Sequence, residues 1–265
     1  ERRPARLRRI GIDMIHRIEE TTSTNDDARD AKYRHGDIVW AERQTAGRGQ
    51  RGHKWSSAEG LNLTFSLVLE PRFLPAGEQF LLNEARIMAQ LRLEGMSADE
   101  AARKVKEENL FRYPTERSLG RITLACNRRL DALGDERLVR IVAYGMPDAA
   151  AQTNLYAMMQ FYPLVRHFMT TEIARRYAEL DYEFGSTDMN AYFTHLASEF
   201  DNFAIMSEST VSKLKQVLRK CLKEAGLLNQ ENRLMPVILD MELENVLRER
   251  KDVEALRAFG AREEM

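Results

Sequence analysis

Residues 207–228 read Ser-Glu-Ser-Thr-Val-Ser-Lys-Leu-Lys-Gln-Val-Leu-Arg-Lys-Cys-Leu-Lys-Glu-Ala-Gly-Leu-Leu, which predicts a long amphipathic helix. Serine is a preferred residue at a helix N-terminus, so Ser207 is expected to begin the helix. Glycine readily follows the last helical turn, so Gly226 is expected to end it. Between these two residues, apolar side chains recur at the three- and four-residue spacing of one helical face. They are Val211, Leu214, Val217, Leu218 and Leu222.

The same helical spacing extends over most of the chain from residue 83 onward. Ser97 and Glu100 have the spacing of a capping box, which marks the start of one of these helices. The pattern therefore predicts a mostly α fold for this part of the chain. Helices are expected over residues 85–94, 97–109, 114–133, 135–144, 148–159, 163–180, 188–201, 207–225 and 240–259.

The first third has a different pattern, with short apolar runs typical of strands. Strands are expected over residues 14–19, 38–42 and 61–69, and a helix is expected to open at Ser23-Thr24-Asn25. The sequence thus predicts a small α+β segment over residues 1–82 and an all-helical domain over residues 83–265.

Composition limits the classes of function. The chain has 265 residues, a net charge of −1 and two cysteines, Cys126 and Cys221, far apart in the sequence. Two distant cysteines do not favour a disulfide framework or a zinc site, and they suit the reducing cytoplasm. No apolar run is long enough to cross a bilayer. We expect a cytoplasmic protein that binds neither a membrane nor a metal.

Because the net charge is close to zero, nucleic-acid binding would depend on local basic patches. One such patch lies on the helix at residues 207–225, opposite its apolar face, and a second lies near residues 117–129. An ordinary amphipathic helix with solvated lysines fits the first pattern too, but a basic face with a polar start suits a recognition helix. The predicted DNA-binding residues are Ser209, Thr210, Ser212, Lys213, Lys215, Arg219, Lys220 and Lys223, with Arg117, Arg121, Arg128 and Arg129.

A glycine- and arginine-rich stretch, Gln-Thr-Ala-Gly-Arg-Gly-Gln-Arg-Gly-His-Lys-Trp, occupies residues 44–55. Glycines let backbone N–H groups turn toward an anion, and guanidinium groups bind carboxylates and phosphates. Together with Ser-Thr-Asn at residues 23–25 and Gly-Leu-Asn-Leu-Thr-Phe-Ser at 60–66, it resembles the start of the catalytic domain of biotin–protein ligases. The resemblance implies a biotin or adenylate site made by Ser23, Thr24, Asn25, Gln44, Gly47, Arg48, Gly49, Arg51 and Trp55.

The chain departs from that family after this segment. The Lys-Trp-Pro-Asn-Asp segment, whose lysine contacts biotin in those ligases, does not occur in this sequence, and neither do the later strands. Adenylation requires the loop and the lysine together to orient both reactants. We therefore expect no catalytic residue and no cofactor, with biotin and ATP as ligands only in the alternative case of a ligase.

Residues 84–97, 108–110, 162–168 and 207–228 together resemble BrxA, a helical component of BREX bacteriophage-exclusion systems. This resemblance covers the chain from residue 83 nearly to its end. It implies an all-helical domain, similar in part to the NusB fold, with helix-turn-helix-like elements that bind double-stranded DNA.

The sequence therefore predicts a non-catalytic, DNA-binding component of an antiviral BREX system, with double-stranded DNA and other BREX proteins as partners. The alternatives are a biotin–protein ligase and a helical scaffold that binds only proteins. Whether the ligase-like piece is vestigial, fused or an appended ligand-binding fragment stays open.

Overall fold

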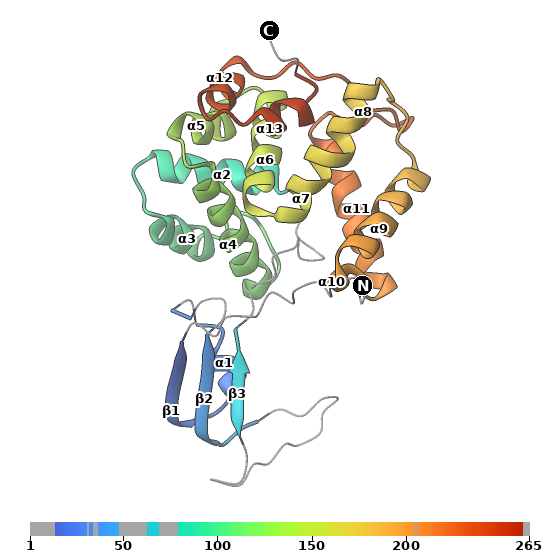
Figure 1. Ribbon diagram of the computed structural model, residues 1–265. Helices are drawn as coiled ribbons and strands as arrows, with labels where there is room; N and C mark the ends of the chain where they lie inside the picture. The colour runs from blue at the N-terminus through green and yellow to red at the C-terminus, as the bar shows by residue number, and fades with distance from the viewer. Residues whose placement is uncertain are drawn as a thin grey trace. The chain divides into compact units, whose positions relative to one another are not determined.

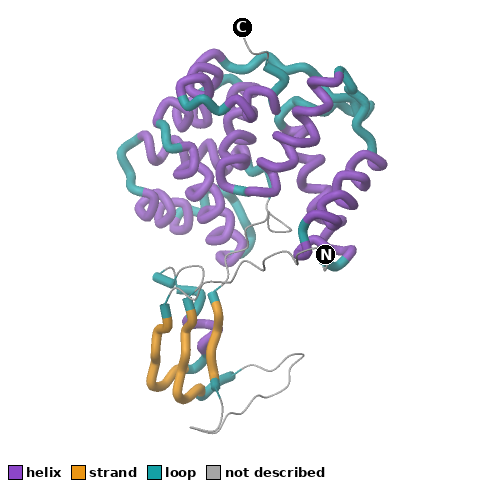
Figure 2. The backbone as a smooth tube through the Cα atoms, in the orientation of Figure 1, coloured by secondary structure: helices purple, strands orange, loops and turns teal. Residues whose placement is uncertain are grey.

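The structure is a computed structural model that describes residues 14–30, 32–33, 37–47, 63–68, 79–204 and 206–261. The chain divides into two compact units, Glu1–Pro71 and Arg72–Met265. The first contains a small sheet and the second is helical (Figures 1 and 2). The predicted fold class, mostly α with a small α+β segment, is confirmed.

The N-terminal unit is built around a three-stranded sheet with the order β1-β2-β3. Strand β1 (Ile15–Thr21) is parallel to β2 (Ile38–Gln44), which is antiparallel to β3 (Thr64–Leu67). The helix predicted after residue 23 is a single turn, α1 (Thr24–Asp27), which packs against β2 and β3. Val39 and Ala41 of the central strand are fully buried, so the sheet has one covered face.

The helical unit follows the predicted order of helices closely, and several helices begin at a side chain that caps them. Ser97 and Glu100 form the expected capping box, and Thr115, Asp135 and Ser207 accept hydrogen bonds from backbone N–H groups in the first turns of their helices. The helices are α2 (Leu82–Leu93), α3 (Ala98–Glu107), α4 (Glu116–Leu133), α5 (Glu136–Tyr144), α6 (Pro147–Phe161), α7 (Pro163–His167), α8 (Ala174–Glu179), α9 (Ser186–Glu199), α10 (Asp201–Ala204), α11 (Glu208–Glu224), α12 (Met241–Glu249) and α13 (Val253–Ala258).

Helix α6 is the centre of this unit. All of its residues from Ala149 to Met159 are buried, so it has no solvent-facing side over that length. A helix that is covered on every side must be surrounded by other elements. Here α2, α4 and α5 pack against it, and α7 continues from its C-terminal end (Figure 1).

Two predicted helices are interrupted in the structure. The helix expected over residues 163–180 runs as α7, a π-helical segment η2 (Phe168–Ile173) and α8. The prediction of a single helix over residues 240–259 is wrong, because the helix is interrupted between α12 and α13. Lys251 adopts a left-handed conformation with φ 55°, and the Asp252 side chain accepts the Ala255 N–H to begin α13.

The segment before α2 is fixed in the helical unit by a buried arginine. Arg129 of α4 is fully buried, and its guanidinium donates to the carbonyl oxygens of Phe80 at 2.8 Å and Gln79 at 2.9 Å. It also lies 5.2 Å from the centre of the Tyr162 ring. Phe80 itself is fully buried, so the packing of the helical unit begins before residue 83.

We expect Arg129→Met to lower the free energy of unfolding of the helical unit by about 2–4 kcal/mol. The substitution keeps much of the side-chain volume but leaves two backbone carbonyls without their charged donor. Chemical denaturation followed by circular dichroism measures the change. Arg121→Met, on the exposed face of the same helix, is the matched control and should change stability by less than about 0.5 kcal/mol. Equal effects of the two variants would contradict the assigned role of Arg129.

Candidate nucleic-acid interface

Helix α11 presents one buried and one polar face. Leu214, Val217, Leu218, Cys221 and Leu222 are buried, as their spacing predicts. Burial raises the pKa of the Cys221 thiol to about 12, so this cysteine is a neutral packing group at physiological pH. The opposite face is exposed and includes Ser209, Ser212, Lys213, Gln216, Lys220 and Lys223, with the acidic Glu208 and Glu224 at the two ends of the helix.

Two isolated β-bridges lie next to α11 in the fold, between Glu183 and Arg233 and between Leu228 and Leu234. Residues 182–184, between α8 and α9, pair with residues 232–234, which pair on their other side with residues 227–229. We call the hairpin at residues 227–235 the wing. Along the chain, α8 is followed by the bridged residues 182–184, helix α9, the short helix α10, helix α11 and the wing. The backbone bonds are Phe184 N–H to Asn232 O at 2.8 Å, Leu234 N–H to Tyr182 O at 2.6 Å, Asn229 N–H to Arg233 O at 3.0 Å and Met235 N–H to Leu227 O at 2.9 Å.

Arg176 of α8 connects the residues just after α8 to the start of α9. Its buried guanidinium donates to Glu172 at 2.6 Å, to Asp181 at 2.9 Å and to Asp188 of α9 at 2.8 Å, and it lies over the Phe184 ring. Burial acts to raise the pKa of Asp188, but hydrogen bonds from the Gly185 N–H and Arg176 outweigh it. The pKa of Asp188 therefore lies below its usual value, and the carboxylate stays charged.

Three basic side chains of α11 contact side-chain amides from other parts of the unit. Lys215 donates to Asn190 of α9 at 2.8 Å and lies over the Phe193 ring. The other two contacts connect α11 to the wing and to the segment before α2. Arg219 donates to Asn232 Oδ1, and Lys220 donates to Gln79 Oε1 at 2.7 Å and lies 3.3 Å from Glu224.

The second predicted patch lies on α4, and its four arginines are not all exposed. Arg117, Arg121 and Arg128 are exposed and follow one face of the helix, and Lys106 of α3 lies close to Gly120 on the same surface. Arg129 is a wrong assignment, because its side chain is fully buried and bonded to backbone carbonyls. Two adjacent arginines of a helix point about 100° apart, so they cannot both face a single ligand surface.

A sequence model of the BrxA family matches residues 76–251, which is more than half of the chain. The chain belongs to the BrxA family. Two similar proteins are both named "BREX protein BrxA". One, from Bacillus cereus (strain H3081.97), is 27% identical over 68% of this chain and 86% of its own length. The other, from Paramagnetospirillum magneticum (strain ATCC 700264 / AMB-1), is 23% identical over 72% of this chain and 98% of its own length.

Similar solved structures include the crystal structure of an uncharacterized protein from Magnetospirillum magneticum. It aligns with a TM-score of 0.61 at 21% identity, over 71% of this chain and 98% of that one. At this identity the likeness shows a shared fold. It carries no information about ligands.

A model described as the Biotin/lipoate A/B protein ligase family matches residues 14–108 of this BrxA-family chain. In the N-terminal unit, the buried Thr24 lies against Gln44, which accepts its backbone N–H at 2.9 Å and its hydroxyl at 3.2 Å. The Thr24 hydroxyl is also 3.1 Å from the hydroxyl of Ser66. Ser23 is buried beside Thr24, and Asn25 is exposed.

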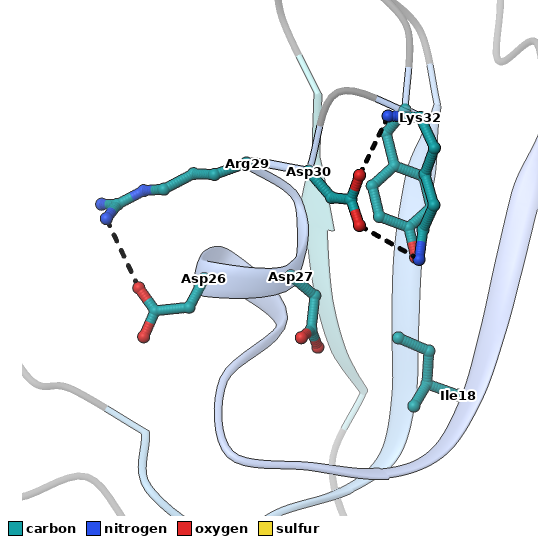
Figure 3. A pocket seen from close by; sticks show the side chains of 7 residues that line it. Ile18, Asp26, Asp27, Arg29, Asp30 and Lys32 are labelled. Carbon is teal, nitrogen blue, oxygen red and sulfur yellow. Dashed lines mark hydrogen bonds and ion pairs between the residues drawn. The ribbon is translucent and has the colours of Figure 1, made fainter. Parts of the chain in front are cut away.

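The rest of the predicted ligand site cannot be compared with the structure. Gly47 ends the described part of the glycine-rich loop, and Arg48, Gly49, Arg51 and Trp55 lie outside the described residues. A hollow of about 430 Å³ in this unit is lined by Asp26, Asp27, Asp30 and nearby side chains (Figure 3). Its dashed contacts join Asp26 to Arg29 and Asp30 to Lys32, so these carboxylates are paired with cations.

Sequence reasoning missed the amide partners of α11 and one exposed polar residue. Gln216 lies in the middle of the exposed face of α11, but it is uncharged, so a pattern of basic residues does not include it. Asn190, Asn232 and Gln79 are distant from α11 in the sequence and carry no recognisable motif. Only their contacts reveal them. Among the described residues, no group of histidine, cysteine, aspartate and glutamate side chains could hold a metal ion.

We expect Gln44→Leu to increase hydrogen exchange at the Thr24 amide and along β2. The substitution removes the acceptor of a buried N–H, which costs about 1–3 kcal/mol in the free energy of local opening. Hydrogen exchange with mass spectrometry measures this peptide by peptide. Gln44→Glu retains an acceptor at the same place and is the control. Unchanged protection in Gln44→Leu would show that this contact does not stabilise the N-terminal unit.

Proposed function

We propose that this chain is a non-catalytic, DNA-binding component of a BREX-type bacteriophage defence system. Its BrxA-family membership and the two relatives named as BREX proteins support the assignment to BREX. The observation that carries the DNA-binding part is the cationic, exposed face of α11 next to a helix and a hairpin. Double-stranded DNA and other BREX proteins are the proposed partners.

The element order around α11 supports a winged helix-turn-helix interpretation. In that architecture, the second helix of the helix-turn-helix lies in the major groove, and the hairpin contacts the flanking backbone. Here α9 is the first helix, α11 is the recognition helix and residues 227–235 form the wing. In this proposal, the uncharged first part of the exposed strip, with Ser209, Ser212 and Gln216, faces base edges, because hydroxyl and amide groups hydrogen-bond to bases. Lys223, about two turns after Gln216, lies in the same strip near the end of the helix.

The basic residues on both sides of that strip are placed to contact phosphates. Lys215 and Arg219 lie on one side of it, and Lys213 and Lys220 lie on the other. Gln79 connects α11 to α4, because its side chain accepts from Lys220 while its backbone carbonyl accepts from Arg129. In our proposal, Arg117, Arg121 and Arg128 extend the phosphate contacts beyond the recognition helix.

The domain assignment and location follow from the same proposal. Residues 83–265 would form the DNA-binding domain, joined to the segment at residues 79–81, and residues 1–82 a ligase-like segment without activity. The thiols of Cys126 and Cys221 are buried and are not joined in a disulfide, which supports a reducing cytoplasm. Within the described ranges, no helix is long and apolar enough to cross a membrane.

A biotin-binding role is the second candidate, because the ligase family match and the contact between Thr24 and Gln44 favour a ligand site in the first unit. The net charge of −1 favours a third, a scaffold that binds only proteins. These candidates differ in their expected ligands. A titration with duplex DNA at several salt concentrations, with biotin and ATP added in a parallel series, separates all three.

We expect the combined variant Lys213→Glu, Lys215→Glu, Arg219→Glu to weaken DNA binding and to lower the slope of log affinity against log salt by about three. Each phosphate contact that is lost removes about one released counterion. Fluorescence anisotropy with a labelled duplex measures both quantities.

The control reverses the same number of charges elsewhere, with Arg140→Glu, Arg175→Glu and Lys251→Glu. Equal losses in the two variants would place the effect in the net charge and not in α11. Saturable biotin binding by a wild-type protein that does not bind DNA would favour the ligand-binding role. A wild-type protein that binds neither would favour the scaffold.

A further inference from the structure

The cations on one edge of α11 have a different kind of partner from several other arginines in the described part of the helical unit. Arg137 contacts the carboxylates of Asp135, Glu242 and Glu249, and this pattern of ion pairs recurs at Arg166, Arg175, Arg176 and Arg248. Lys215 and Arg219 instead contact the neutral amides of Asn190 and Asn232. Because the chain has 41 acidic residues, carboxylates are not scarce.

The two amides come from different elements and meet one edge of α11. Lys215 and Arg219 are four residues apart, so they lie one turn apart on the same side of the helix. Asn190 is on α9, and its amide oxygen is 2.8 Å from the Lys215 ammonium. Asn232 is in the wing and adopts a left-handed conformation with φ 63°, which asparagine tolerates better than most residues. Both cations are half-buried against these neighbours.

An amide and a carboxylate have different effects on a cation. Either one accepts a hydrogen bond and fixes the direction of a long side chain, whose ordering is otherwise an entropic cost of binding. Only the carboxylate neutralises the charge, so an ion pair would have to be broken before the cation could bind a phosphate. An amide therefore orients the cation and leaves its full charge available to another anion.

We propose that Asn190 and Asn232 are positioning residues that hold Lys215 and Arg219 in place, still fully charged, for the phosphate groups of DNA. The inference rests on the proposed DNA-binding function and assigns the α9 and wing side of α11 to the phosphate backbone. Lys220 is an internal comparison, since it contacts both the amide of Gln79 and the carboxylate of Glu224. Its charge is partly offset, so it contributes less to the salt dependence than Lys215 or Arg219.

The test compares two substitutions at each asparagine in the full chain, with a labelled duplex as the probe. Asn190→Asp and Asn232→Asp keep the hydrogen bond but add a charge. Each should lower the slope of log affinity against log salt by about one. Asn190→Ala and Asn232→Gly remove the hydrogen bond only. They should leave the slope unchanged and weaken binding by about two- to tenfold. Glycine is used at position 232 because an alanine would be strained at positive φ.

Asn245→Asp is the matched control, because the same substitution adds the same charge at an exposed residue of α12, outside the proposed DNA surface. The proposal is supported if both aspartate variants lower the slope and this control does not. It is overturned if all three acids lower the slope equally, since the effect would then be a general field. It is also overturned if the aspartate variants behave like the wild type while the wild type binds DNA. A wild type without DNA binding overturns the proposed function itself.

Discussion

The buried guanidinium of Arg129 is the interaction on which the helical unit depends. An arginine cannot lose its charge inside a protein, so its burial is tolerated only where hydrogen bonds replace water. The carbonyl oxygens of Gln79 and Phe80 and the ring of Tyr162 provide these partners. The same contacts fix the chain just before α2, and Asn154 of α6 donates to the Phe80 carbonyl as well. These contacts therefore hold four parts of the unit together, namely residues 79–81, α4, α6 and the start of α7.

That constraint extends to the proposed DNA surface. Gln79 is held through its backbone by Arg129, and its side chain accepts a hydrogen bond from Lys220 of α11. The other side of α11 is held by Asn190 of α9 and Asn232 of the wing. The buried Arg176 in turn holds α9 through Asp188. Helix α11 is thus supported from both edges, and Ser212 and Gln216 between these edges are exposed. Such support by rigid neighbours is what a preorganised binding surface requires.

The N-terminal unit and the helical unit raise separate chemical questions. In the first, the side chains expected to hold a ligand contact each other, with Gln44 accepting both the N–H and the hydroxyl of Thr24. The match to the ligase family model extends to residue 108, so it overlaps the match to the BrxA family model in α2 and α3. Of the carboxylates lining the hollow of this unit, Asp26 and Asp30 are paired with Arg29 and Lys32, and Asp27 accepts a hydrogen bond from the Thr21 hydroxyl (Figure 3). The surface that we propose for DNA is on α11 and α4 of the helical unit.

The sequence alone determined the helices, because helix formation depends on contacts within a few residues. Periodic apolar positions and the caps at Ser97, Thr115, Asp135 and Ser207 are local, so they can be recognised without the fold. Only the tertiary structure decided which basic side chains face solvent. Arg128 and Arg129 are adjacent and chemically identical, yet one is exposed and the other is fully buried. The wing and the amide contacts of α11 join residues as far as 141 positions apart. Such contacts depend on how the helices pack, which no local pattern specifies.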